Sequence, residues 1–105
     1  MTANIDNATR KAVYRRDHYR CALCDSTDGI QIHHAIPRGK GGASTVQNLI
    51  TLCWRDHALI HSGRKWHVGD DITAEEVEQL CIEYLADYYT DDHHIWNPWE
   101  RSGGL

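Results

Sequence analysis

Four of the eight histidines lie between residues 32 and 61, and their spacing is suited to metal-dependent hydrolysis. His57 and His61 are four residues apart, so on a helix they share one face and can bind the same ion. His33 and His34 are adjacent, so on an extended segment their side chains point to opposite sides and can serve two roles. We therefore predict one divalent ion on His33, His57 and His61, with His34 left as a general base.

Phosphodiester hydrolysis requires an attacking water, a base that takes its proton, and positive charge near the phosphorane. Imidazole suits the role of the base, because its unperturbed pKa of ~6.5 leaves it largely neutral at cellular pH. Asn48 has neither acid nor base strength, so we expect its amide to hydrogen-bond the backbone around His34 and orient that ring. The ion would be Mg²⁺, Mn²⁺, Ni²⁺ or Co²⁺, and imidazole ligands favour the last three.

The cysteines predict a second, structural metal site. Cys21 and Cys24 are two residues apart and precede a turn-rich segment, as in a zinc knuckle. Cys53 and Asp56 repeat this spacing and would complete a tetrahedral zinc site, because zinc also accepts carboxylate oxygen. His18 is the alternative fourth ligand, and a cluster that holds no metal is the other alternative.

One structural zinc site, or a set of polar residues satisfied within a small core, would be the simpler explanation for these side chains. A closed zinc site uses four ligands, whereas the chain offers three histidines, three cysteines and an aspartate. A second site with open coordination positions accounts better for the surplus, and this favours catalysis.

Charge is distributed unevenly along the chain. Residues 10–67 carry ten Lys and Arg against four Asp and Glu, a net +6, whereas residues 68–105 carry a net −9. The part that holds the histidines and cysteines is therefore basic, as expected of a surface that binds phosphates. The side chains expected to bind DNA are Arg15, Arg16, Arg38 and Lys40.

The apolar pattern predicts an α+β fold in which a strand, a glycine-rich loop, a strand and a helix position the histidines. Pro37 ends the first strand, and the loop from Arg38 to Gly42 is expected to form a turn. In chain order we expect a basic helix over residues 8–17 with Asn7 as its N-cap, strands over residues 30–35 and 49–52, a helix over residues 53–61 and a short strand over residues 65–68.

The acidic C-terminal third predicts one amphipathic helix, which begins with a capping box formed by Thr73 and Glu76. We expect its apolar face to pack on the side away from the cleft; the alternative is an autoinhibitory DNA mimic lying across the basic face. The tail after Thr90 either folds back or remains loose. The residues expected on the apolar face are Val77, Leu80, Cys81, Tyr84, Leu85 and Tyr88.

A chain of 105 residues fits a single domain, with a core over about residues 10–67 followed by the helix and tail of residues 68–105. Its first residues are polar, and nothing in it resembles a signal peptide or a transmembrane span, so we expect a cytoplasmic protein. In that compartment cysteines are more often metal ligands than disulfides.

The histidines, Asn48 and the cysteines together resemble the HNH endonucleases of the ββα-metal (His-Me finger) class, in the zinc-knuckle branch common in phage and bacteria. The family's three letters fall on His34, Asn48 and His57, and the intervals are similar to those in the nuclease domains of the DNase colicins. The resemblance covers roughly residues 10–67 and implies metal-dependent cleavage of DNA. The chain departs from it at Asp56, where a second knuckle cysteine is usual.

Two other functions stay open at this point. One is a zinc-stapled DNA-binding module without activity, against which the intact His34 and Asn48 argue. The other is an RNase or toxin-like nuclease, because a metal and a base act on phosphate and do not read the sugar. Double-stranded DNA is the expected partner, no membrane partner is expected, and the resemblance suggests a role in phage genome processing or packaging.

Overall fold

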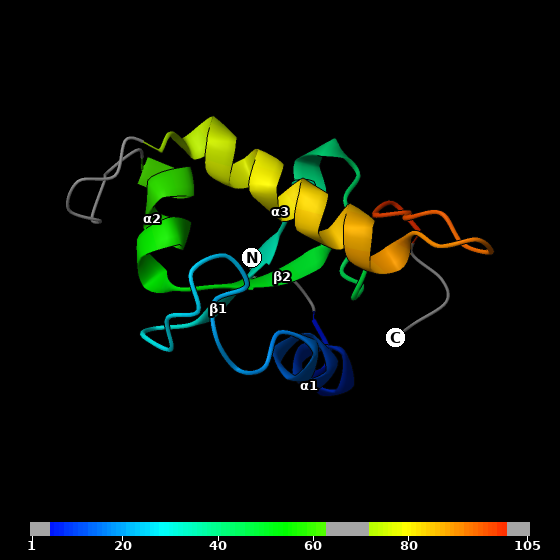
Figure 1. Ribbon diagram of the computed structural model, residues 1–105, viewed down its shortest axis with the longest axis horizontal. Coiled ribbons are helices and arrows are strands. Elements are labelled where there is room, and N and C mark those ends of the chain that lie inside the picture. Colours follow the sequence, from blue (N-terminus) through cyan, green and yellow to red (C-terminus); the bar gives the residue numbers. More distant parts are fainter. Residues whose placement is uncertain (1–4, 63–71, 101–105) are drawn as a thin grey trace.

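The computed structural model describes residues 5–62 and 72–100 and shows a small α+β fold around a two-stranded sheet, as the sequence predicts (Figure 1). The predicted strand over residues 65–68 lies outside the described residues. Within the described part of the chain, no helix is both long and apolar enough to cross a membrane. The elements are α1 (Asn7–Arg16), β1 (Gln31–His34), the short 3₁₀ turn η1 (Arg38–Lys40), β2 (Leu49–Leu52), α2 (Trp54–Ser62) and α3 (Ala74–Tyr89).

The two strands form an antiparallel pair that leads directly into α2. The register sets His33 opposite Ile50 and His34 opposite Leu49. Every residue of β2 is buried, because α1 and α2 both contact this strand, and in the view of Figure 1 the hairpin lies between α1 and α3. The boundaries of β2 are those predicted, whereas β1 is one residue shorter at each end.

The helix starts show one correct and one wrong prediction. At α3 the capping box is present, since the Thr73 hydroxyl accepts from the Glu76 backbone N–H and the Glu76 carboxylate accepts from that of Thr73. At α1 the N-cap is Asp6 and not Asn7, because the Asp6 carboxylate accepts from the Thr9 backbone N–H at 2.7 Å. A carboxylate at this position also interacts favourably with the helix dipole.

The face that α3 buries is narrower than predicted. Val77, Cys81 and Leu85 recur every four residues and are buried in the core against α2 and β2. Leu80 and Tyr88 were also expected on this face, but they lie beside that line and are 41% and 58% exposed. The fully buried residues of α3 therefore form a single stripe, and Ile82, Tyr84 and Tyr89 pack against the same core while partly buried.

The end of α1 is joined to β2 and α3 by a buried ion pair. Arg16 and Asp17 make two charge-assisted hydrogen bonds of 2.8 Å, and their side chains are 5% and 0% exposed. The Asp17 carboxylate also accepts from the Tyr84 hydroxyl on α3 and from the Thr51 backbone N–H on β2. One carboxylate thus satisfies donors from three elements.

Asp17→Ala is expected to lower the free energy of unfolding by ~3–5 kcal/mol, because it leaves a buried guanidinium without its counter-charge. Urea denaturation monitored by circular dichroism measures the change. Asp28→Ala is the matched control: its carboxylate pairs with Arg55 but its side chain is 61% exposed, so its removal should cost ~1 kcal/mol or less. Equal losses from the two variants would contradict a special role for the buried pair.

The tail folds back on the loop between the strands, which decides between the two predicted alternatives. The Trp96 indole N–H donates to the Gln47 carbonyl at 2.5 Å, and the Asn97 backbone N–H donates to the Gln47 side chain. The Ala43 backbone N–H donates to the carbonyl of Pro98, which is buried. The tail thus contacts the loop between the strands, which contains Asn48, at Ala43 and at Gln47.

Candidate metal centres and catalytic cleft

Three histidines from two elements converge beside the hairpin. His33 is a buried residue of β1, and His57 and His61 lie one turn apart on α2. The Nε2 atoms of His57 and His61 are 3.0 Å apart, and one nitrogen from each of the three rings lies within 4.8 Å of the other two. The structure therefore brings together the three residues predicted to hold the divalent ion.

The Nε2 atom of His33 is buried and has no hydrogen-bond partner among the described residues. An unsatisfied buried polar atom costs ~1–3 kcal/mol, so such atoms are rare without a ligand or a bound water. The rings of His57 and His61 lie 5.5 and 5.6 Å from that of His33, centroid to centroid. A cation between the three rings would satisfy this nitrogen, so the residues fit a metal ion.

The surroundings of His33 and His57 favour the neutral imidazole, the form that binds a metal. Burial, with the nearby rings of His57 and His61 as lesser causes, lowers the pKa of His33 to about 3. Burial also lowers the pKa of His57, with His61 as the second cause. A neutral imidazole offers a lone pair to a metal, whereas a protonated one does not.

His34 lies in the same cleft, but a different residue holds its ring. Its Nε2 atom is 3.0 Å from the Ser44 hydroxyl oxygen, in the loop between the strands. Burial lowers the pKa of His34, and the positive charge of Arg38 acts in the same direction. When Nε2 donates its hydrogen to Ser44, Nδ1 carries the free lone pair and can accept a proton. No sequence pattern had pointed to Ser44.

Asn48 is fully buried and closes the loop that follows His34. Its side-chain oxygen accepts from the Ile36 backbone N–H at 2.7 Å, and its amide nitrogen donates to the carbonyls of Ile36 and Ala43. Gly42 is required beside it, since a Cβ there would lie 1.9 Å from the Ile36 carbonyl oxygen. The side chain predicted to have a geometric role thus makes three backbone hydrogen bonds, two at Ile36 and one at Ala43.

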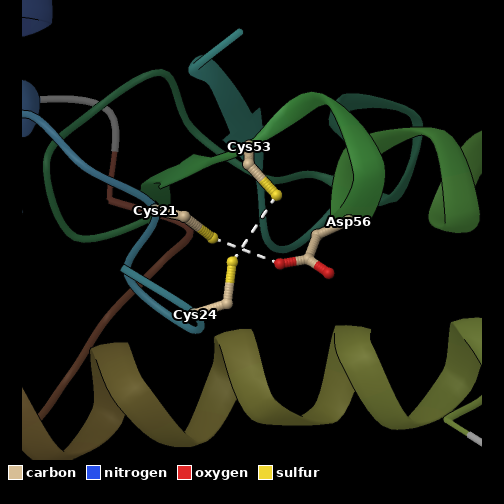
Figure 2. Close-up of side chains that lie close together, drawn as sticks. All are labelled: Cys21, Cys24, Cys53 and Asp56. Atoms are coloured by element: carbon tan, nitrogen blue, oxygen red, sulfur yellow. Dashed lines mark hydrogen bonds between the residues drawn. The ribbon is translucent and has the colours of Figure 1, made fainter. Parts of the chain in front are cut away.

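The second cluster lies at the start of α2 (Figure 2). Cys21 and Cys24 come from the turn after α1, and Cys53 and Asp56 from the junction of β2 and α2, with all four ligand atoms within 4.8 Å of one another. The Cys21 thiol is 3.2 Å from the Asp56 carboxylate, and the sulfurs of Cys24 and Cys53 are 3.6 Å apart. His18, the alternative fourth ligand, is exposed and does not belong to this cluster.

The four ligand atoms of this cluster also fit a metal electrostatically. Burial raises the pKa of both Cys21 and Cys53, because a thiolate in this core would lose its hydration. A divalent cation would supply the charge that stabilises the thiolates. Cys81, on the neighbouring face of α3, is a buried core residue as predicted and lies outside the cluster.

A cleft of about 460 Å³ opens over the three clustered histidines and His34. Arg38 lines one part of it, and so does Glu78 of α3. The prediction that α3 packs away from the cleft is therefore wrong at Glu78. The reason is that α3 packs against α2, which itself carries His57 and His61, so the first turns of α3 reach the edge of the cleft.

The four predicted DNA-binding cations do not share one environment. Arg15, Arg38 and Lys40 are exposed, and Arg38 and Lys40 lie on η1 beside the cleft. Arg16 requires a correction, because its guanidinium donates to Asp17, to the carbonyls of Val46 and Leu49, and to the Tyr89 hydroxyl. With its donors engaged inside the protein, Arg16 stabilises the fold and is not placed to bind phosphate.

The segment that contains the sheet, α2 and both clusters is similar to proteins of a known family. Residues 21–63 match the model of the HNH endonuclease family, a segment that contains the cysteine cluster, the hairpin and α2. The chain belongs to the HNH endonuclease family, which has a nuclease function, generally binds metal and acts on nucleic acid. It is also 34% identical over 55 residues to the Nostoc protein named anaredoxin, covering 51% of this chain and 72% of that protein.

Proposed function

We propose that this protein hydrolyses phosphodiester bonds of DNA, with one divalent ion on His33, His57 and His61 and with His34 as the general base. The observation that carries the proposal is the buried Nε2 atom of His33, which has no hydrogen-bond partner in residues 5–62 and 72–100 and lies beside two further imidazoles that line the same cleft. An ion on the three rings would satisfy this nitrogen, and the cleft above the rings leaves room for a substrate. A metal-dependent nuclease needs this nitrogen for the ion.

The other residues of the cleft have roles that follow from their positions. A bound divalent ion would stabilise the negative charge that develops on the phosphate and on the leaving oxygen. His34 accepts the proton of the attacking water through Nδ1, while Ser44 holds the opposite side of the ring. Arg38 and Lys40 bind the phosphates on either side of the scissile bond, and Asn48 keeps the loop in place.

The cysteine cluster is proposed to hold a structural zinc ion. Cys21, Cys24, Cys53 and Asp56 supply four ligands, so no coordination position is left for a substrate. The cluster joins the turn after α1 to the start of α2. Its role is therefore to fix the helix that presents His57 and His61 to the cleft.

Plasmid cleavage tests the proposal most directly. Supercoiled DNA should be nicked or linearised when Mn²⁺, Ni²⁺, Co²⁺ or Mg²⁺ is added to protein treated briefly with chelator, and should stay intact without added metal. Structured RNA serves as the second substrate. Cleavage of RNA but not of DNA would show that RNA is the substrate. Cleavage of neither nucleic acid with any of the four metals would refute the proposal.

His61→Ala is expected to raise the metal concentration needed for half-maximal cleavage by at least ~10-fold, because it removes one of three protein ligands. A metal titration of the cleavage rate measures this shift. His93→Ala, which changes an exposed histidine of the tail, is the matched control and should leave the titration unchanged. An unaltered titration for His61→Ala would leave only two protein ligands in the site.

A further inference from the structure

Trp99 is a large aromatic side chain that the fold holds in place without burying it. Its side chain is 53% exposed, although the tail just before it is anchored to the loop between the strands by Trp96, Asn97 and Pro98. Trp96 packs against the core, and its ring lies 6.4 Å from that of Trp99. The two indoles therefore differ: that of Trp96 packs against the core, whereas that of Trp99 exposes apolar surface to solvent.

The position of Trp99 places this surface beside the cations of the cleft. Its Cδ1 atom lies 3.5 Å from the point that a Cβ on Gly41 would occupy. Gly41 is the left-handed residue that ends η1, directly after Arg38 and Lys40, and Arg38 lines the cleft above the histidines. The indole, the two exposed cations and the cleft thus follow one another along the surface.

We propose that Trp99 is a stacking platform for an unpaired nucleobase of the substrate strand. This inference rests on the proposed nuclease function, since it extends the same cleft by one base subsite. Proteins that bind single strands combine cations for the phosphates with aromatic rings on which bases stack. Arg38 and Lys40 supply the cations and Trp99 the ring, so charge and shape both fit a nucleotide.

The kind of base that can stack on Trp99 follows from the need to expose its flat face to the indole. A base inside an intact duplex is stacked on both sides by its neighbours and cannot reach an aromatic ring on the protein surface. The subsite therefore accepts a base from a single-stranded segment, a flap or the edge of a gap. We expect the protein to prefer DNA with unpaired bases near the cut over intact duplex.

Fluorescence anisotropy with the full chain tests the subsite without requiring cleavage. The probes are a labelled single-stranded oligonucleotide and the same sequence as a blunt duplex, in buffer without added divalent metal or chelator. Trp99→Ala should weaken binding of the single strand by about 5- to 150-fold, the range for loss of one stacked base, and change duplex binding little. Tyr88→Ala, which removes another exposed aromatic ring, is the control and should change neither.

Two further variants separate stacking from packing. Trp99→Phe keeps an aromatic face and should retain most of the affinity for the single strand, whereas Trp99→Leu keeps apolar volume against Gly41 but should lose it. Equal losses for single strand and duplex, or no loss at all, would overturn the proposal, as would full affinity in Trp99→Leu. A protein that binds through Trp99 but cleaves nothing would refute the nuclease function and leave the base subsite standing.

Discussion

Cys53→Ser is expected to unfold most of the chain at room temperature and to abolish tightly held zinc. Cys53 is fully buried where β2 joins α2, so a lost thiolate ligand detaches the turn after α1 from the helix. Structural zinc contributes ~10–16 kcal/mol of apparent binding free energy, whereas a small native protein is stable by only ~5–15 kcal/mol. Circular dichroism and elemental analysis after brief chelation measure both losses.

The matched control is Cys81→Ser, which makes the same change at a buried cysteine outside the cluster. It should retain its zinc and cost no more than the burial of one hydroxyl, ~1–3 kcal/mol. If Asp56 is the fourth ligand, Asp56→Ala should behave like Cys53→Ser. Full stability and zinc content in Asp56→Ala would exclude it as a ligand.

His34→Ala is expected to lower the cleavage rate by ~10²–10⁴-fold, the range for loss of a general base. Its ring contacts Ser44 at the surface of the cleft and is not among the three clustered histidines, so the metal dependence and the thermal unfolding temperature should stay as they are. Single-turnover cleavage of a labelled oligonucleotide at saturating metal measures the rate.

Added imidazole provides a further readout for this variant. A small base can enter the space left by the missing ring and restore part of the rate, whereas it should not help an enzyme whose fold or metal has been lost. Ser44→Ala keeps the base but releases its ring, so its rate should fall between those of His34→Ala and the unaltered protein. Near-normal activity of His34→Ala would move the base elsewhere, with His33 the first alternative.

The elements with strong local signals could be predicted from the sequence. β2 is a continuous apolar run and appears with the predicted boundaries, and α3 begins at the capping box that Thr73 and Glu76 specify. The pairing of His57 and His61 followed from their one-turn spacing, because α2 brings both to one side. In each case the information lies within a few residues along the chain.

Contacts between distant elements could not be predicted in this way. Arg16 looked like a surface cation because Arg10, Lys11 and Arg15 precede it, and only the fold shows the Leu49 carbonyl and the Tyr89 hydroxyl beside its guanidinium. Leu80 fits the helical apolar pattern, but the stripe that meets α2 is too narrow to cover it. The position of Glu78 at the cleft could not be predicted either, because it depends on how α3 packs against α2, a tertiary contact that no local pattern specifies.

The adjacency of Asp56 and His57 has a consequence for how the protein acquires its ions. These neighbours belong to different clusters, and the His57 backbone N–H donates to the Cys53 carbonyl at 3.0 Å, so one helical turn is common to both. An ion that orders this turn reduces the entropy that the other must still remove, and such an effect is reciprocal by thermodynamic necessity. Each ion should therefore raise the affinity of the other, so protein stripped of the metal in the cysteine cluster is expected to bind an ion at the three histidines more weakly.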